Sequence, residues 1–96
     1  MNLERVFAAQ TCPVCGYRLG FRPWSNDCPK NRGCPCCGMF FGHDDTDVKK
    51  RETTYLRWRL HWIATGKRWT STAPEPDDYD PNQQLAHLGK LENDFE

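Results

Sequence analysis

The sequence predicts a small α+β protein in which a zinc-ribbon lobe with short antiparallel strands packs on a long helix, followed by a second, short helix. Two observations lead to this prediction. All six cysteines fall within residues 12–43 of the 96-residue chain, and a stretch with helical periodicity follows at residues 44–66. A chain of this length fits one domain, residues 1–96, with a modest core. We therefore expect a metal to stabilise the cysteine-rich lobe.

One motif occurs twice in that lobe. CPVCG at residues 12–16 and CPCCG at residues 34–38 align position for position, with 18 residues between the second cysteine of the first copy and the first cysteine of the second. We call these turns the first and second knuckle. Their spacing is typical of zinc sites. Proline restricts φ at the start of each turn, and the final glycine tolerates positive φ. The predicted ligands are Cys12, Cys15, Cys34 and Cys37.

Four thiolates at about 2.3 Å from one Zn²⁺ make a closed tetrahedral site, which is structural and not catalytic. Such a site contributes about 10–16 kcal/mol of apparent binding free energy, more than a lobe of this size gains from its own core. Iron in a rubredoxin-like site is the alternative, because the knuckle does not select its metal.

Two cysteines are left over, Cys28 in the intervening segment and Cys36 inside the second knuckle. We interpret both as structural thiols, with the Cys36 side chain directed away from the metal. Two alternatives stay open: either thiol displaces a ligand or joins a second metal, or the two form a disulfide.

Short apolar runs flank the knuckles. Tyr17–Phe21 and Met39–Gly42 fit strands beside a metal site, whereas Ser25–Gly33 is rich in turn formers and is expected to be a loop.

The long helix is expected over residues 44–66. Asp45–Asp47 offer an N-cap and negative charge at the positive end of the helix dipole, and Gly66 is a natural stop. Apolar side chains recur at intervals of three, four and seven and predict one broad buried stripe. The stripe comprises Val48, Tyr55, Leu56, Leu60, Trp62 and Ile63.

The C-terminal part begins with an acidic, proline-rich linker at residues 72–79. A short helix is expected at residues 80–89, because Asp80 is a good N-cap, Pro81 suits the first helical position and Gly89 can end it.

Charge is segregated along the chain although it sums to zero. Residues 1–68 carry 12 basic and 6 acidic side chains, net +6, and residues 69–96 carry 1 and 7, net −6. Either the acidic tail folds across the basic helix, or the basic face binds nucleic acid, or the acidic segment binds a basic partner.

A reducing cytoplasm is the expected compartment. The apolar run Val6–Ala9 is too short for a signal-peptide core, and Glu4 precedes it. No stretch approaches the roughly 18 apolar residues of a membrane span, so we expect no membrane partner. In the cytoplasm, closely spaced cysteines bind metal more often than they form disulfides.

Candidate partner-binding residues fall in two groups. The first is an aromatic and arginine cluster on the long helix, a composition favoured at binding hot spots, which would otherwise clamp the helix to the ribbon. The second is the acidic segment, which would otherwise be a solvated linker. The candidates are Tyr55, Trp58, Arg59 and Trp62 on the helix, and Glu75, Asp77, Asp78 and Asp80 in the acidic segment.

Several of these motifs together resemble the small bacterial cysteine-rich CPCC proteins: CPVCGY, CPCCGMFFGHDD, the tryptophan-bearing helix ending in GKRW, and NQQL beyond the linker. The similarity runs from about Thr11 to Leu88, and the Cys28-Pro29 loop departs from the pattern. The resemblance implies a zinc-ribbon module. Association of some family members with toxin genes further implies an immunity protein.

We weigh three functions. The first is a non-enzymatic protein-binding module, most concretely a bacterial immunity protein that neutralises a cognate toxin domain. The second is a nucleic-acid-binding zinc ribbon, with basic side chains on phosphates and aromatic rings on bases. The third is an enzyme or redox protein with a reactive thiol at Cys28 or Cys36. The sequence has no Ser/His/Asp set and no phosphate-binding glycine loop, and zero net charge disfavours nucleic acid, so the first is favoured.

Overall fold

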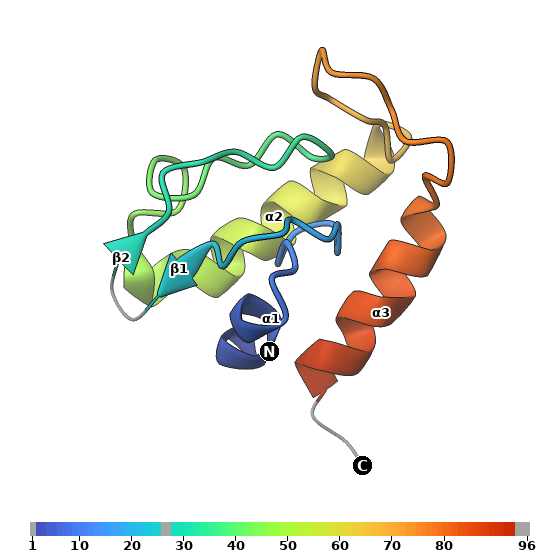
Figure 1. Ribbon diagram of the computed structural model, residues 1–96. Helices are drawn as coiled ribbons and strands as arrows, with labels where there is room; N and C mark the ends of the chain where they lie inside the picture. The colour runs from blue at the N-terminus through green and yellow to red at the C-terminus, as the bar shows by residue number, and fades with distance from the viewer. Residues whose placement is uncertain (1, 26–27, 94–96) are drawn as a thin grey trace.

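The computed structural model describes residues 2–25 and 28–93 and confirms a small α+β protein. In Figure 1, α2 runs behind the coil that carries both knuckles, α3 lies along one side, and the β1–β2 hairpin lies near the start of α2. The elements in chain order are α1 (Leu3–Ala8), β1 (Trp24–Ser25), β2 (Cys28–Pro29), the 3₁₀ helix η1 (Val48–Lys50), α2 (Arg51–Ala64) and α3 (Pro81–Asn93).

The strands are not where the sequence predicted them. Tyr17–Phe21 and Met39–Gly42 form no strand, and each makes one antiparallel bridge, Thr11 with Arg18 and Gly33 with Phe40. Within the described residues the two-stranded sheet lies instead at the start of the expected loop and just before it, with Trp24 paired to Pro29 and Ser25 to Cys28. Each bridge stays short because a glycine with positive φ, Gly20 (81°) or Gly42 (96°), soon turns the chain away.

Helix α1 was not predicted. The Asn2 side chain caps it by accepting a hydrogen bond from the Arg5 N–H at 3.2 Å. Val6 and Phe7 are fully buried in this helix. They belong to the apolar run that is too short for a signal-peptide core. The Val6 carbonyl accepts the N–H of Thr11, so α1 leads directly into the first knuckle.

Helix α2 begins later than expected. Residues 41–47 form turns and coil, and Asp47, which precedes η1, makes no side-chain capping bond. The guanidinium of Arg51, the first residue of α2, lies 5.2 Å from the Phe7 ring centroid and 5.0 Å from that of Trp24. These cation–π contacts attach the start of the helix to α1 and the hairpin.

The end of α2 agrees with the prediction. Gly66 has a φ of 105°, the N–H of Lys67 bonds to the Trp62 carbonyl, and the N–H of Gly66 bonds to the Ile63 carbonyl. These two bonds form a Schellman motif, which requires a left-handed residue at the glycine position.

Asp45 has a different role from the predicted N-cap. Its carboxylate is 1% exposed and accepts hydrogen bonds from the Gly42 N–H at 2.6 Å, the Trp24 indole at 2.8 Å and the Tyr55 hydroxyl at 2.6 Å. A buried carboxylate needs such partners to offset its lost hydration. Asp45 therefore joins the hairpin, the segment after the second knuckle and α2.

Helix α3 starts as predicted and ends later. Asp80 accepts the N–H of Gln83 at 3.1 Å, and Pro81 is the first helical residue. Gly89 does not end the helix, which continues to Asn93. Added atoms at Gly89 would meet nothing within 4 Å, so neither a close approach nor a left-handed turn requires glycine there.

The predicted apolar stripe on α2 is correct for its two aromatic residues, Tyr55 and Trp62, and wrong for its aliphatic ones, which are exposed. Tyr55 and Trp62 are 0% and 3% exposed, whereas Leu56, Leu60 and Ile63 are 43%, 66% and 37% exposed. We call these three residues the aliphatic face of α2. The knuckles lie against the other face, where aromatic and arginine N–H groups bond to backbone carbonyls.

Candidate metal centre

The two knuckles have the same backbone conformation. Gly16 donates its N–H to the Cys12 carbonyl at 3.0 Å, and Gly38 donates to the Cys34 carbonyl at 2.9 Å. The φ angles of the two glycines are 81° and 85°, in the region that glycine adopts without strain. The repeated motif therefore produces a repeated turn.

The structure brings all four predicted ligands together. The Sγ atoms of Cys12 and Cys37 are 3.6 Å apart, as are those of Cys15 and Cys34, and all four sulfurs lie within 4.8 Å of one another. Tetrahedral Zn²⁺ with bonds of about 2.3 Å places its sulfurs about 3.8 Å apart. The cluster is buried and has the size to hold one metal ion.

Burial of the cluster disfavours thiolates unless a cation is bound. Burial raises the pKa of the Cys15 and Cys37 thiols well above the ordinary value, because a thiolate there loses its hydration. A divalent ion supplies the positive charge that keeps coordinating thiols deprotonated. The N–H of Val14 points at the Cys12 sulfur at 3.4 Å and adds a favourable dipole.

Two of the predicted partner-binding residues support the knuckles. The Arg59 guanidinium donates to the Pro13 and Val14 carbonyls, both at 2.8 Å. The Trp58 indole is half-buried and donates to the Cys37 carbonyl at 2.8 Å.

Arg59 also joins α2 to α3. Its guanidinium forms a two-pronged ion pair with Glu92, with N–O distances of 2.6 and 3.4 Å. Part of the acidic C-terminal region therefore folds across the basic helix.

The other two aromatic candidates lie in the core. Tyr55 bonds to Asp45, and the Trp62 indole donates to the Arg68 carbonyl at 3.0 Å. Both side chains are buried, so neither presents an exposed hot spot to a partner. Tyr55 and Trp62 therefore pack in the core as the alternative of a clamp predicts, and a partner-binding role for Trp58 and Arg59 stays a prediction.

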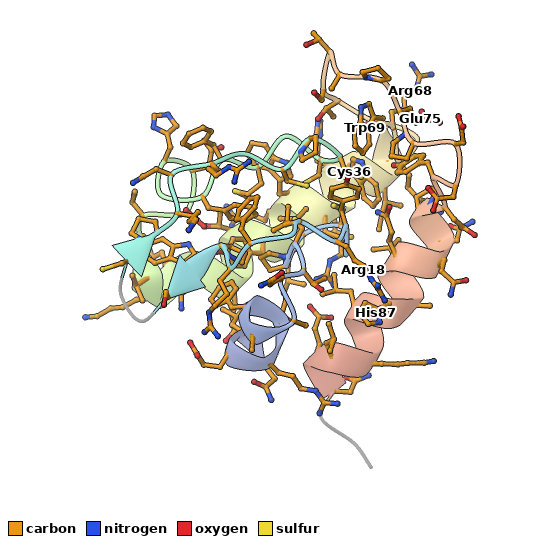
Figure 2. The ribbon with its side chains drawn as sticks, in the orientation of Figure 1. Arg18, Cys36, Arg68, Trp69, Glu75 and His87 are labelled. Carbon is orange, nitrogen blue, oxygen red and sulfur yellow. The ribbon has the colours of Figure 1, made fainter. Side chains whose placement is uncertain are left out.

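The acidic candidates lie on the surface. Glu75, Asp77, Asp78 and Asp80 are exposed in the segment that joins α2 to α3, where Figure 2 labels Glu75. One of them also has a local role, since Asp80 caps α3.

The inner thiol of the second knuckle is a structural contact. Cys36 is buried, and its sulfur lies 3.3 Å from the Tyr79 hydroxyl and 3.6 Å from the Gln84 amide nitrogen. The Tyr79 hydroxyl donates to the Lys67 carbonyl at 2.7 Å, so the Cys36 thiol donates to the Tyr79 oxygen. Cys28 is exposed on β2, and both cysteines are free thiols in this structure.

Sequence reasoning missed the residues that cover the first knuckle. A Cβ on Gly16 would lie 2.2 Å from the Gln84 carbonyl oxygen, and the Gln84 side chain donates to the Cys15 carbonyl at 3.3 Å. Only the helical face shared by Gln84 and Leu88 hinted at this contact. Its partner lies 69 residues away, beyond the reach of a local pattern.

No helix in the described ranges 2–25 and 28–93 is long and apolar enough to cross a membrane. Comparison with protein-family models, with curated proteins and with solved structures found no match for the chain.

Proposed function

We propose that the chain is a non-enzymatic protein-binding module whose shape is held by one structural Zn²⁺ at Cys12, Cys15, Cys34 and Cys37. Its most concrete role is that of a cytoplasmic immunity protein that neutralises a cognate toxin domain, as the CPCC resemblance implies. A closed four-thiolate centre supports the non-enzymatic part, because it leaves no coordination position for a substrate.

The aliphatic face of α2 carries this proposal. Leu56, Leu60 and Ile63 follow one another at helical spacing, and Val48 just before the helix is 47% exposed. Single exposed aliphatic residues are ordinary, but a contiguous row on one helix marks an interaction surface. A helix of this kind docks its row of anchors into an apolar groove of a partner.

Charge around the row indicates the partner's chemistry. Lys49, Lys50 and Arg57 are exposed beside it, and their side chains form no hydrogen bond or ion pair with the described part of the chain. A partner with an apolar groove and an acidic rim fits this surface by complementarity. The exposed acidic segment between α2 and α3 offers a second contact to basic groups on the same partner.

The test is affinity capture from host lysate with the zinc-loaded wild-type protein and a Leu56→Glu/Leu60→Glu variant. We expect one stoichiometric protein that survives nuclease and moderate salt and is lost with the variant, because the charges oppose an apolar groove and an acidic rim. Ala86→Glu is the matched control, since it adds a charge at an exposed position of α3. Equal capture by wild type and variant would contradict the proposed surface.

A nucleic-acid-binding function is the second candidate, and one observation favours it. An open pocket of about 540 Å³ is lined by Thr54, Arg57, Trp58 and His61, which offers an indole for base stacking beside a cation for phosphate. Capture of RNA or DNA that is lost with nuclease and with rising salt would support this function over the first.

A further inference from the structure

A second cleft lies between the first knuckle and α3, away from the aliphatic face of α2. Its volume is about 360 Å³, within the range of small-ligand sites. One wall comes from the residues that follow Cys15, and the other comes from the end of the linker and the first two turns of α3.

The cleft is formed by contacts that fix its walls. Gly16 packs against the backbone of Gln84, and the Gln84 side chain bonds to the Cys15 carbonyl. Trp69 lies edge-on to both Tyr17 and Tyr79, with ring centroids 5.3 and 5.7 Å apart, and the two tyrosines line the cleft. A site built in this way exists before a ligand binds, which lowers the ordering cost of binding.

Two cationic or donor side chains face this space. Arg18, which follows the first knuckle, and His87 of α3 both line the cleft, and Figure 2 labels the two side chains near each other beside α3. Neither forms a hydrogen bond or an ion pair with any described residue. A guanidinium beside an imidazole is suited to a carboxylate, which accepts several N–H bonds at once.

The opposite end of the cleft is acidic. Asp78 lines it without a hydrogen bond or ion pair to the described residues, and Asp80 uses one carboxylate oxygen to cap α3. Asp80 and His87 are seven residues apart, which corresponds to about 10 Å along a helix. An extended peptide of three residues spans about the same length.

We propose that this cleft binds a short zwitterionic peptide of about three residues. The peptide carboxylate lies between Arg18 and His87, its free ammonium group lies at Asp78 and Asp80, and its backbone crosses the tyrosine wall. Such a peptide would give Arg18 and Asp78, which are not paired with each other, one charged partner each. This site is separate from the aliphatic face of α2, and it shares Asp78 and Asp80 with the acidic segment.

Triglycine is the probe, because it has both terminal charges and no side chains. We expect NMR titration of the zinc-loaded protein to shift the amides of Tyr17, Arg18 and the first two turns of α3. N-acetyl-triglycine lacks the ammonium group and triglycine amide lacks the carboxylate. Each should bind about three- to fivefold more weakly, as expected for the loss of one partly exposed ion pair.

Variants then assign each end of the peptide. Arg18→Gln should weaken triglycine and leave triglycine amide unchanged, whereas Asp78→Asn should weaken triglycine and leave N-acetyl-triglycine unchanged. Arg57→Gln and Glu75→Gln, exposed positions outside the cleft, should bind as wild type. The proposal is overturned if triglycine leaves the cleft amides unshifted, if the capped peptides bind equally well, or if the two variants match wild type.

Discussion

The first and second knuckles share a turn and differ in what covers them. In the first, the backbone of α3 lies so close that an added Cβ on Gly16 would sit 2.2 Å from a carbonyl oxygen. In the second, a Cβ on Gly38 would meet the Thr70 hydroxyl at 3.3 Å, the far end of an exposed side chain. The local motif therefore determines the turn, and distant parts of the chain determine how tightly it is enclosed.

The repeat extends beyond the cysteines. Positions that set the turn are the same in both copies, and positions that contact other parts of the chain differ. Gly20 and Gly42 occupy matching positions, and both have positive φ, because the backbone turns after each knuckle. At other matching positions the residues differ: Val14 against Cys36, and Arg18 against Phe40. These positions face different neighbours, so different side chains fit them.

The largest effect should come from removing a ligand, and it should be equal in the two knuckles. Cys15→Ser and Cys37→Ser each leave three thiolates, so the proposed zinc and its roughly 10–16 kcal/mol of apparent binding free energy should be largely lost. Native mass spectrometry should show one zinc in wild type and none in either variant, with near-UV circular dichroism lost as well. Zinc retained by only one of the two variants would contradict the prediction that the two knuckles contribute equally to zinc binding.

Glycine replacement should separate the knuckles. Gly16→Ala and Gly38→Ala share a penalty of about 1–2 kcal/mol for a left-handed alanine. Gly16→Ala should cost about 1–3 kcal/mol more, because it must displace the α3 backbone. Urea unfolding at fixed free zinc measures both, and similar midpoints for the two variants would contradict the close approach of α3.

Removing the α2 side chains that donate hydrogen bonds to the knuckles should also destabilise the protein more at the first knuckle than at the second. The difference should be smaller than for the glycine replacements. Arg59→Leu leaves the Pro13 and Val14 carbonyls and the Glu92 carboxylate without their partner and should cost about 3 kcal/mol. Trp58→Phe removes one bond to the second knuckle and should cost about 1 kcal/mol. Equal losses in urea unfolding would mean that Arg59 does not serve as the main support of the first knuckle.

The smallest effect should follow from replacing Cys36 of the second knuckle with valine, the residue at the matching position of the first. Cys36→Val removes the thiol contacts with Tyr79 and Gln84 and should cost about 1 kcal/mol, with one zinc retained. Zinc content by native mass spectrometry and the urea midpoint measure the two effects. Loss of zinc would identify Cys36 as a ligand.

Features that depend on interactions between near neighbours in the sequence could be predicted, and features that depend on distant residues could not. The knuckles, the start of α3 and the end of α2 depend on neighbours within a few residues, so motifs and capping patterns found them. Asp45 was predicted to be an N-cap because acidic residues often precede a helix. It instead accepts hydrogen bonds from Trp24 and Tyr55, which come near it only in the folded chain. The exposed face of α2 was missed because periodicity identifies apolar residues but not what covers them.

The distance along the chain between the first knuckle and its cover has a consequence for synthesis. All four ligands precede residue 38, whereas Gln84, whose side chain covers the Cys15 carbonyl, is added much later. Chains emerge N-terminal end first. A nascent chain could therefore take up the proposed metal while the centre is still open on the side of α3, with the helix closing over the first knuckle afterwards. In the folded protein, exchange of that metal on the side of the first knuckle should require α3 to detach.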